Sequence, residues 1–212
     1  MMRRDTLSDL IIHLKSQRPD TIAVTGDLVN LALDEEISRA SAWLAALGAP
    51  ETTCAIPGNH DGYVKGALDK GLSTYGPYMT GETIDGEAFP YVRRHGEVAL
   101  IGVSSAIVTP PFVAAGNVGA GQIERMGRML HGLGEAGYFR VVMIHHPPDA
   151  DQAASRRLGL WDGAAVREAI RANGAELVLH GHTHTSSIHA IKAGDREIPV
   201  IGVAAASAAP EG

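Results

Sequence analysis

One pattern, repeated four times along the chain, constrains the fold more than any other: a short apolar run ends in a small polar motif. The runs are rich in β-branched residues, which is typical of buried strands. Each motif is therefore expected at the carboxyl end of a strand. In chain order the motifs are Gly26-Asp27, Gly58-Asn59-His60-Asp61, His145-His146-Pro147 and Gly181-His182-Thr183-His184.

Helical periodicity separates these runs, and the alternation predicts an α/β fold with a largely parallel sheet. The sequence predicts helices over 6–17, 34–47, 122–133 and 162–172, strands over 21–25, 53–56, 98–103, 139–144 and 176–179, and a hairpin of 186–192 with 198–204. Asp162 is expected to cap the helix that follows it, whereas residues 66–89 show no clear periodicity. Sites in α/β sheets form beyond the carboxyl ends of the strands, so the four motifs are expected to converge.

The composition fits one globular domain over residues 1–212, with 45% hydrophobic and 20% charged residues. The net charge of −6 argues against a protein that coats nucleic acid, and no segment of the sequence is typical of a membrane span. The single cysteine, Cys54, cannot form an internal disulfide, so a cytoplasmic location is expected.

The first two motifs offer oxygen ligands and a candidate proton donor. Asp27 can bridge two metal ions through its two carboxylate oxygens, although an Asp after a strand commonly caps the next segment. Asn59 can offer an amide oxygen, or it can serve the turn after Pro57-Gly58. The side chain of His60 is expected to point elsewhere, toward a substrate, where it can donate a proton or stabilise phosphoryl charge. Asp61 can orient His60, so these two are the candidate catalytic residues.

The last two motifs offer imidazoles. His145 ends a buried strand, where an imidazole needs a hydrogen bond or a metal. His146 is expected to face the other way and to have a structural role. The i, i+2 spacing places His182 and His184 on one side of an extended segment, as two candidate metal ligands. His180 precedes this turn and is expected to be a hydrogen-bonded core histidine.

The order G-D, G-N-H-D, H-x-P and G-H-x-H, each at a strand end, resembles the calcineurin-like metallophosphoesterase superfamily. Within it the chain is most similar to small bacterial phosphodiesterases that resemble cyclic-nucleotide and glycerophosphodiester hydrolases. The resemblance runs from about Asp5 to Ala206. It implies a metallophosphoesterase-type β-sandwich flanked by helices, an αββα arrangement. It also implies a small-molecule phosphodiester substrate, hydrolysed through a metal-bound hydroxide.

The resemblance further implies a dinuclear centre of two divalent ions of Mn, Fe or Zn. Asp27 would bridge the two ions. Asn59, His145 and His182 would complete the shell of the second ion, and His184 would join Asp27 on the first. His60 would contact the phosphate or the leaving group.

The chain departs from this family in one motif, because no Asp-x-His precedes Asp27. In the family that motif ends the first strand and supplies two ligands to the first metal, so this chain is expected to hold one metal ion. It is accordingly expected to be a truncated form of a longer product that lacks the first strand and the C-terminal strands of the fold. Exposed strand edges would then favour self-association. The alternative function is a catalytically impaired metal-binding scaffold or interaction protein of the same fold.

Overall fold

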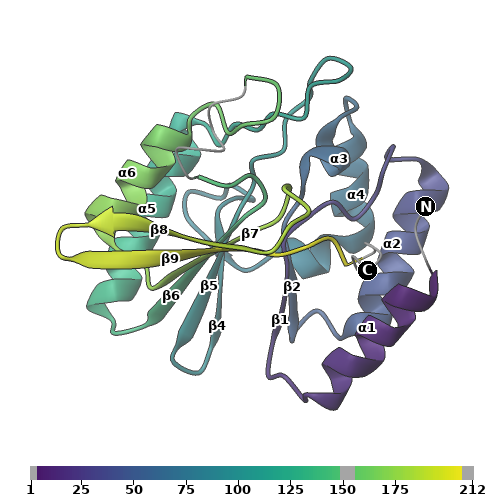
Figure 1. Ribbon diagram of the computed structural model, residues 1–212, viewed down its shortest axis with the longest axis horizontal. Helices are drawn as coiled ribbons and strands as arrows, with labels where there is room; N and C mark the ends of the chain where they lie inside the picture. The colour runs from purple at the N-terminus through teal and green to yellow at the C-terminus, as the bar shows by residue number, and fades with distance from the viewer. Residues whose placement is uncertain (1–3, 149–155, 207–212) are drawn as a thin grey trace.

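The computed structural model of the chain describes residues 4–148 and 156–206 and contains two sheets with helices on either side (Figure 1). A two-stranded parallel sheet pairs β1 (Ile22–Val24) with β2 (Thr53–Ala55). A seven-stranded sheet has the order β3-β4-β5-β6-β7-β9-β8. Its strands are β3 (Glu82–Thr83), β4 (Tyr91–His95), β5 (Val98–Val103), β6 (Phe139–Ile144), β7 (Leu177–His180), β8 (Ser187–Ala193) and β9 (Arg196–Gly202).

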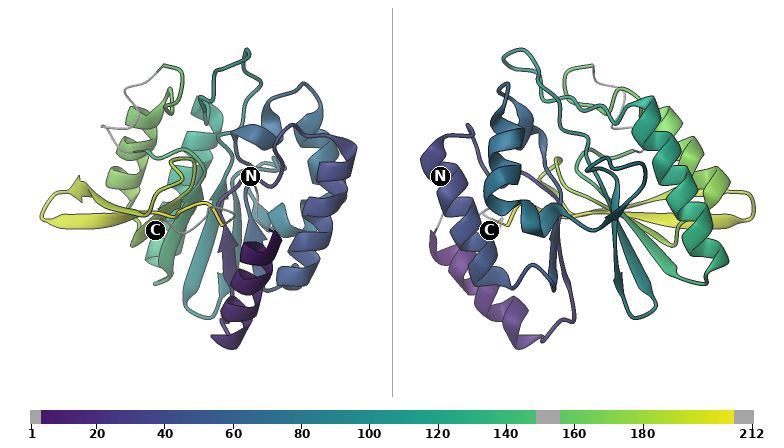
Figure 2. Two further views of the ribbon diagram at one scale, coloured as in Figure 1. Left: turned by 45° about the vertical axis from the view of Figure 1, so that its right-hand side comes forward. Right: turned by 180° about the vertical axis from the view of Figure 1, so that it is seen from behind.

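The helices form the outer layers. They are α1 (Arg4–Ser16), α2 (Asp34–Leu47), α3 (Asn59–Gly62), α4 (Ala67–Tyr75), the 3-10 helix η1 (Gly76–Met79), α5 (Ala120–Glu135) and α6 (Gly163–Asn173). In Figure 1, α1, α2 and α4 lie beyond the small sheet, whereas α5 and α6 lie on the opposite side of the large sheet; Figure 2 shows the same separation from two further directions. None of the described helices is long and apolar enough to cross a membrane.

Two apolar cores hold these layers together. One core joins the large sheet to α5 and α6, and it includes Leu130 and Val166. The other joins the large sheet to the small sheet and α2, and it includes Leu44 and Ile56. Strands β5 and β6 contribute to both cores, because alternate side chains of a strand point to opposite faces. The nearly continuous apolar runs of these strands therefore reflect burial on both faces.

The large sheet is mixed, so the prediction of a largely parallel sheet is wrong. Strands β5, β6, β7 and β9 pair in parallel in that order, whereas β3–β4, β4–β5 and β8–β9 are antiparallel pairs. The hairpin of β8 and β9 agrees with the prediction. Strand β4 is not predicted from the sequence. Three of its five residues, Arg93, Arg94 and His95, are polar, so it lacks the apolar alternation that is typical of a strand.

Outside residues 66–97 the predicted helices and strands agree closely with the structure. Helix α2 occupies the predicted 34–47, and the N–H of Gly48 ends it by donating to the carbonyl oxygen of Leu44. Helix α4 and η1 lie within residues 66–89, where no element is predicted. The buried residues of α4 are Ala67, Gly71 and Tyr75. Two of the three, Ala67 and Gly71, are small and give little apolar periodicity.

Asp162 stands at the N-terminal end of α6, but its side chain does not cap that helix as predicted. Its carboxylate instead accepts hydrogen bonds from the N–H groups of Val118 at 3.0 Å and Gly119 at 2.7 Å. These two residues directly precede α5. Asp162 therefore ties the beginning of α5 to the beginning of α6.

A buried arginine joins the helical layer to the large sheet. Arg140 of β6 is 7% exposed. It pairs with Glu176 at 2.7 Å and donates to the carbonyl oxygens of Leu130 and Asn173, both at 2.9 Å. The hydrogen bond from Arg140 holds the pKa of the Glu176 carboxyl below its ordinary value of 4.5. The ionised carboxylate therefore contributes to the stability of the folded chain.

We expect Glu176→Gln to lower the free energy of unfolding by about 1–2 kcal/mol at neutral pH, because Arg140 loses its counter-charge while it stays buried. The contribution of the carboxylate is complete above its ordinary pKa and is lost as the pH falls through the lowered folded-state pKa. The difference between wild type and variant should therefore shrink in acid. Urea unfolding at neutral and acid pH measures both effects.

Glu168→Gln is the matched control, because the pair of Glu168 with Arg171 is exposed. This variant should change the free energy of unfolding by less than about 0.5 kcal/mol. An equal loss in the two variants would contradict the structural role of the Arg140–Glu176 pair.

Candidate metal centre

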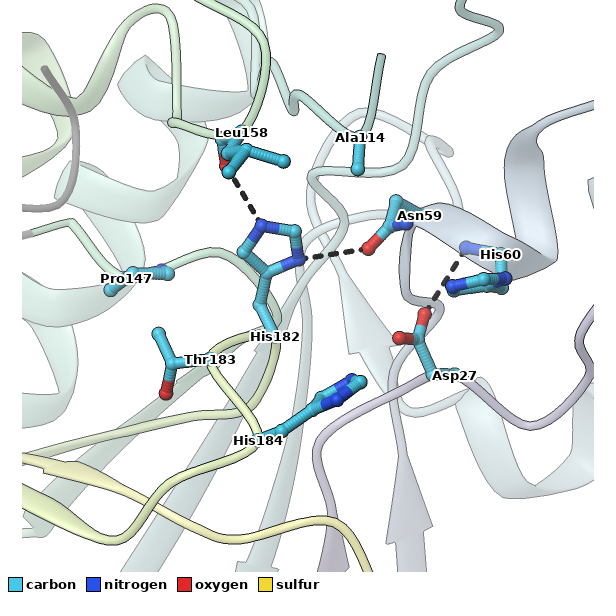
Figure 3. Close-up of a pocket in the computed structure, with 9 residues that line it drawn as sticks. All are labelled: Asp27, Asn59, His60, Ala114, Pro147, Leu158, His182, Thr183 and His184. Carbon is cyan, nitrogen blue, oxygen red and sulfur yellow. Dashed lines mark hydrogen bonds between the residues drawn. The ribbon is translucent and has the colours of Figure 1, made fainter. Parts of the chain in front are cut away.

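All four motifs meet at the carboxyl ends of β1, β2, β6 and β7, where they border an open cavity of about 400 Å³. The convergence predicted from the strand ends is therefore present in the structure. His145 lies beneath the cavity and is 1% exposed. The cavity itself is lined by Asp27, Asn59, His60, Ala114, Pro147, Leu158, His182, Thr183 and His184 (Figure 3).

Asn59 lies at the centre of the group. It is the first residue of α3 and is only 2% exposed. Its Oδ1 lies 2.9 Å from Nε2 of His145 and 2.9 Å from Nδ1 of His182. Asp27 is close by, because its Oδ1 lies 3.4 Å from the same Nε2 of His145. Two oxygens and two imidazole nitrogens thus face one another where the two sheets meet.

On the side away from Asn59, each imidazole bonds a backbone carbonyl oxygen. Nδ1 of His145 lies 2.7 Å from the carbonyl oxygen of Thr25, and Nε2 of His182 lies 2.8 Å from that of Leu158. A carbonyl oxygen only accepts hydrogen bonds, so each of these nitrogens carries the proton. The other nitrogen of each neutral ring is left with a lone pair that is directed at Asn59. Histidine ligands of metal ions are commonly oriented in this way.

Burial keeps both rings neutral near pH 7, since it lowers the pKa of His145 and lowers that of His182 to about 4. The two nitrogens that face Oδ1 of Asn59 are therefore acceptors, as is the oxygen itself. This conflict is removed either by turning the amide through 180° or by a cation among the three groups. In the structure Nδ2 of Asn59 donates to the hydroxyl of Tyr63 at 2.5 Å, which is the orientation that a cation requires. The donor set therefore fits a divalent metal ion.

His184, the remaining candidate ligand, is placed differently. It lines the cavity but is exposed, and its ring points toward Asp27 in Figure 3. In the described part of the chain, no group of three or more His, Cys, Asp or Glu side chains is arranged to hold a metal ion. A metal ion bound here would therefore depend on the amide oxygen of Asn59 in addition to the imidazoles and the carboxylate.

His60 also lines the cavity, and a backbone group sets its orientation. Its Nδ1 lies 2.7 Å from the carbonyl oxygen of Asn30. Its ring meets the ring of Tyr63 edge to face, with 4.7 Å between the centroids. Tyr63 thus contacts two residues of the same motif, His60 through its ring and Asn59 through its hydroxyl.

The prediction that Asp61 orients His60 is wrong, because the carboxylate of Asp61 bonds elsewhere. It accepts hydrogen bonds from the N–H groups of Gly58 at 2.8 Å and Leu28 at 3.3 Å and from the hydroxyl of Tyr75 at 3.3 Å. Asp61 is 1% exposed, and this burial raises its pKa to about 6. Its side chain joins the segment after β1 to the segment after β2.

The two histidines that the sequence assigns to structural roles are both buried. His180 places its Nδ1 2.9 Å from the carbonyl oxygen of the next residue, as expected of a core histidine. His146 does not simply face the other way, because its ring centroid lies 4.4 Å from that of His182. Its two ring nitrogens bond the hydroxyl of Ser105 at 2.7 Å and the carbonyl oxygen of Ala114 at 3.1 Å. His146 therefore packs against one candidate ligand, His182, and bonds one residue of the cavity wall, Ala114.

The backbone at the site is strained. Asp27, His182 and His184 have φ values of 57°, 65° and 58°, in the left-handed region that few non-glycine residues adopt. Strain of this kind persists where surrounding contacts impose it, and it gathers at functional sites. Gly58 is required for a different reason, since a Cβ at this position would collide with the carboxylate and the backbone nitrogen of Asp27.

We expect Gly58→Ala to abolish tight Mn²⁺ binding, because the added methyl group displaces Asp27 and the turn that carries Asn59. The same collision should lower the free energy of unfolding by about 2 kcal/mol or more. Isothermal titration with Mn²⁺ and urea unfolding measure the two effects. Gly132→Ala in α5 is the control, because its Cβ would meet no atom within 4 Å. Unchanged Mn²⁺ affinity in Gly58→Ala would contradict this geometry.

Sequence reasoning missed the groups that orient the site. The carbonyl oxygens of Thr25, Asn30 and Leu158 give no signal in a sequence, because every residue carries such a group. Tyr63 does give a signal, since it follows Asn59 by four residues, a spacing that brings side chains together on a helix.

The sequence profile of the calcineurin-like phosphoesterase family matches residues 2–186 of the chain. Phosphodiesterase YaeI of Escherichia coli (strain K12) is 26% identical over 198 residues, which cover 92% of this chain and 59% of the relative. A protein of Synechococcus sp. named as a probable cyclic nucleotide phosphodiesterase is 28% identical over 178 residues, 83% of this chain and 62% of the relative. The chain thus spans about three fifths of the length of these two curated relatives.

Solved structures share the arrangement of the chain. A dimetal phosphatase from Danio rerio superposes with a TM-score of 0.75 at 14% identity, covering 97% of this chain and 79% of that one. The sulfate thiohydrolase SoxB of Thermus thermophilus superposes with a TM-score of 0.56 at 16% identity, covering 95% and 38%. The fold is therefore an α/β metallophosphatase-like fold, with a mixed sheet flanked by helices.

Proposed function

The chain belongs to the calcineurin-like phosphoesterase family, and we propose that it hydrolyses phosphodiesters with divalent metal ions held at the ends of β1, β2, β6 and β7. The observation that carries this proposal is the arrangement of Asn59, His145 and His182, whose lone pairs are directed at the same point. The carboxylate of Asp27 lies beside them. Both curated relatives are named as phosphodiesterases, which supports the same class of substrate.

The candidate ligands divide between two metal positions. Asn59, His145 and His182 would hold one ion, His184 would hold the other, and Asp27 would serve both. When bound, Mn, Fe or Zn ions would supply an activated water as nucleophile and neutralise charge on the phosphoryl oxygens. The position of Asn59, His145 and His182 draws four ligands from this chain when Asp27 is included, whereas the position of His184 draws two. We therefore expect the four-ligand position to bind its ion more tightly.

His60 has a position suited to acid catalysis. Its Nδ1 donates to the carbonyl oxygen of Asn30, so Nε2 is the nitrogen that can meet a substrate. Its backbone N–H donates to Oδ1 of Asp27 at 3.1 Å, which ties the main chain of His60 to this carboxylate. In its protonated form the ring can give a proton to the leaving group or a hydrogen bond to a phosphoryl oxygen.

The lining of the cavity favours a diester over a monoester. No lysine or arginine of the described ranges lines it. A diester carries one negative charge, whereas a monoester carries about two near pH 7, so the diester needs less compensation. Part of the wall is apolar, formed by Ala114, Pro147 and Leu158, and this part can accept the second ester group of a diester.

A second candidate function is a metal-binding scaffold without turnover. It is favoured by the exposure of His184 and by the lack, over residues 4–148 and 156–206, of three or more His, Cys, Asp or Glu side chains arranged around one point. Such a scaffold would hold one ion through Asn59, His145 and His182 and would not assemble the second position.

Hydrolysis of bis(p-nitrophenyl) phosphate by the chain with added Mn²⁺ tests the proposed function. We expect turnover, and we expect His60→Ala to lower kcat by about 10²–10³-fold because the hydrogen bond from His60 to a phosphoryl oxygen is lost. His189→Ala is the matched control, since His189 is an exposed histidine on β8, outside the cavity lining. It should leave kcat unchanged.

Full activity in His60→Ala would contradict the role given to His60. A folded chain that binds Mn²⁺ and shows no turnover would contradict the proposed hydrolysis and would favour the scaffold.

A further inference from the structure

The two loops that form part of the apolar cavity wall also carry large exposed apolar side chains. The wall consists of Ala114, Pro147 and Leu158. Large apolar side chains stand exposed on the two loops that carry Ala114 and Leu158. We call these side chains the apolar rim: Val108, Phe112, Leu158 and Trp161, which are 60%, 95%, 55% and 55% exposed.

Backbone hydrogen bonds join the two loops of the apolar rim. The N–H of Ala114 donates to the carbonyl oxygen of Arg157 at 2.7 Å, and the N–H of Gly116 donates to that of Gly159 at 3.1 Å. Leu158 lies between these two contacts, so both loops border the same mouth of the cavity. In Figure 1 the loop between β5 and α5 projects beyond the body of the molecule at the top of the view.

Phe112 is exposed to solvent and has an unfavourable backbone conformation. Its φ is 66°, which is an outlier for a bulky residue. The turn that imposes it is closed by a hydrogen bond from the N–H of Val113 to the carbonyl oxygen of Pro110 at 3.1 Å. The hydroxyl of Thr109 donates to the carbonyl oxygen of Val113 at 2.6 Å. A strained turn that exposes an aromatic ring is consistent with a binding role.

The apolar rim offers contact area and few hydrogen bonds. The hydroxyl of Thr109 is used within its own turn, and the indole N–H of Trp161 donates to the carbonyl oxygen of Arg156 at 3.0 Å. A nucleobase or a sugar has polar edges that need partners when they are buried. A hydrocarbon group has no such need, so the rim suits a hydrocarbon.

We propose that the apolar rim binds the hydrocarbon part of a phosphodiester whose phosphate lies at the candidate metal centre. The inference rests on the proposed function and adds to it a substrate class, phosphodiesters that carry an alkyl chain. The chain would lie along Leu158 and reach Phe112, and the phosphate would lie among Asp27, Asn59 and His60 at the polar end of the same cavity.

Binding of two phosphinates to the Mn²⁺-loaded chain tests this inference without turnover. Methyl(octyl)phosphinate and dimethylphosphinate each carry one negative charge and have no ester bond to hydrolyse. We expect the octyl compound to bind at least about tenfold more tightly in isothermal titration, because burial of about two methylene groups suffices for that factor.

Two variants locate the preference on the apolar rim. Phe112→Asn keeps a residue that tolerates a positive φ, and Val108→Ser removes a second exposed side chain of the rim that lies outside the cavity lining. Each should reduce the preference for the octyl compound to about threefold or less, as contact with methylene groups is lost. The dissociation constant of dimethylphosphinate should not change. Ile188→Ser is the matched control, since Ile188 is 81% exposed on β8, outside the cavity lining.

Equal affinity for the two phosphinates, or a preference that survives in both rim variants, would overturn the apolar rim as a binding site. Hydrolysis of bis(p-nitrophenyl) phosphate is measured separately, so the proposed function would stand in that case. A wild-type chain that binds neither phosphinate and hydrolyses no diester would overturn this inference and the proposed function together.

Discussion

The candidate site depends on one local conflict, in which two neutral imidazoles and an amide oxygen direct lone pairs at the same point. Such a cluster of acceptors inside a protein is unfavourable unless a donor or a cation lies among them. The carbonyl oxygens of Thr25 and Leu158 create the conflict, because they fix the protons on the far nitrogens of the rings. Tyr63 maintains it by holding the amide nitrogen of Asn59.

The fold brings these groups together where two sheets meet. Strands β1 and β2 belong to the small sheet, β6 and β7 belong to the large one, and an apolar core packs the two sheets against each other. The close passage of Gly58 by Asp27, and the hydrogen bonds from Leu28 and Gly58 to the carboxylate of Asp61, then fix the loops that carry the ligands. The position of the site therefore follows from sheet packing, and its fine geometry follows from short loop contacts.

Part of this arrangement could be predicted from the sequence, because strand burial and strand ends depend on residue type and local period. The motif resemblance is confirmed by the family match over residues 2–186. The partner of His60 could not be predicted, since Asn30 contributes only its backbone oxygen while Asp61 is its neighbour in the chain. Helix α4 could not be predicted because two of its three buried residues, Ala67 and Gly71, are small, and β4 could not because Arg93 and Arg94 interrupt its apolar pattern.

Crystals of the chain grown with Mn²⁺, with anomalous diffraction recorded near the manganese absorption edge, test the central claim most directly. If a metal ion is held by the converging lone pairs, we expect an anomalous peak within ligand distance of Oδ1 of Asn59, Nε2 of His145 and Nδ1 of His182. Density in which the Asn59 amide has turned its Nδ2 toward the two imidazoles, with no anomalous peak among them, would contradict a metal centre at this place.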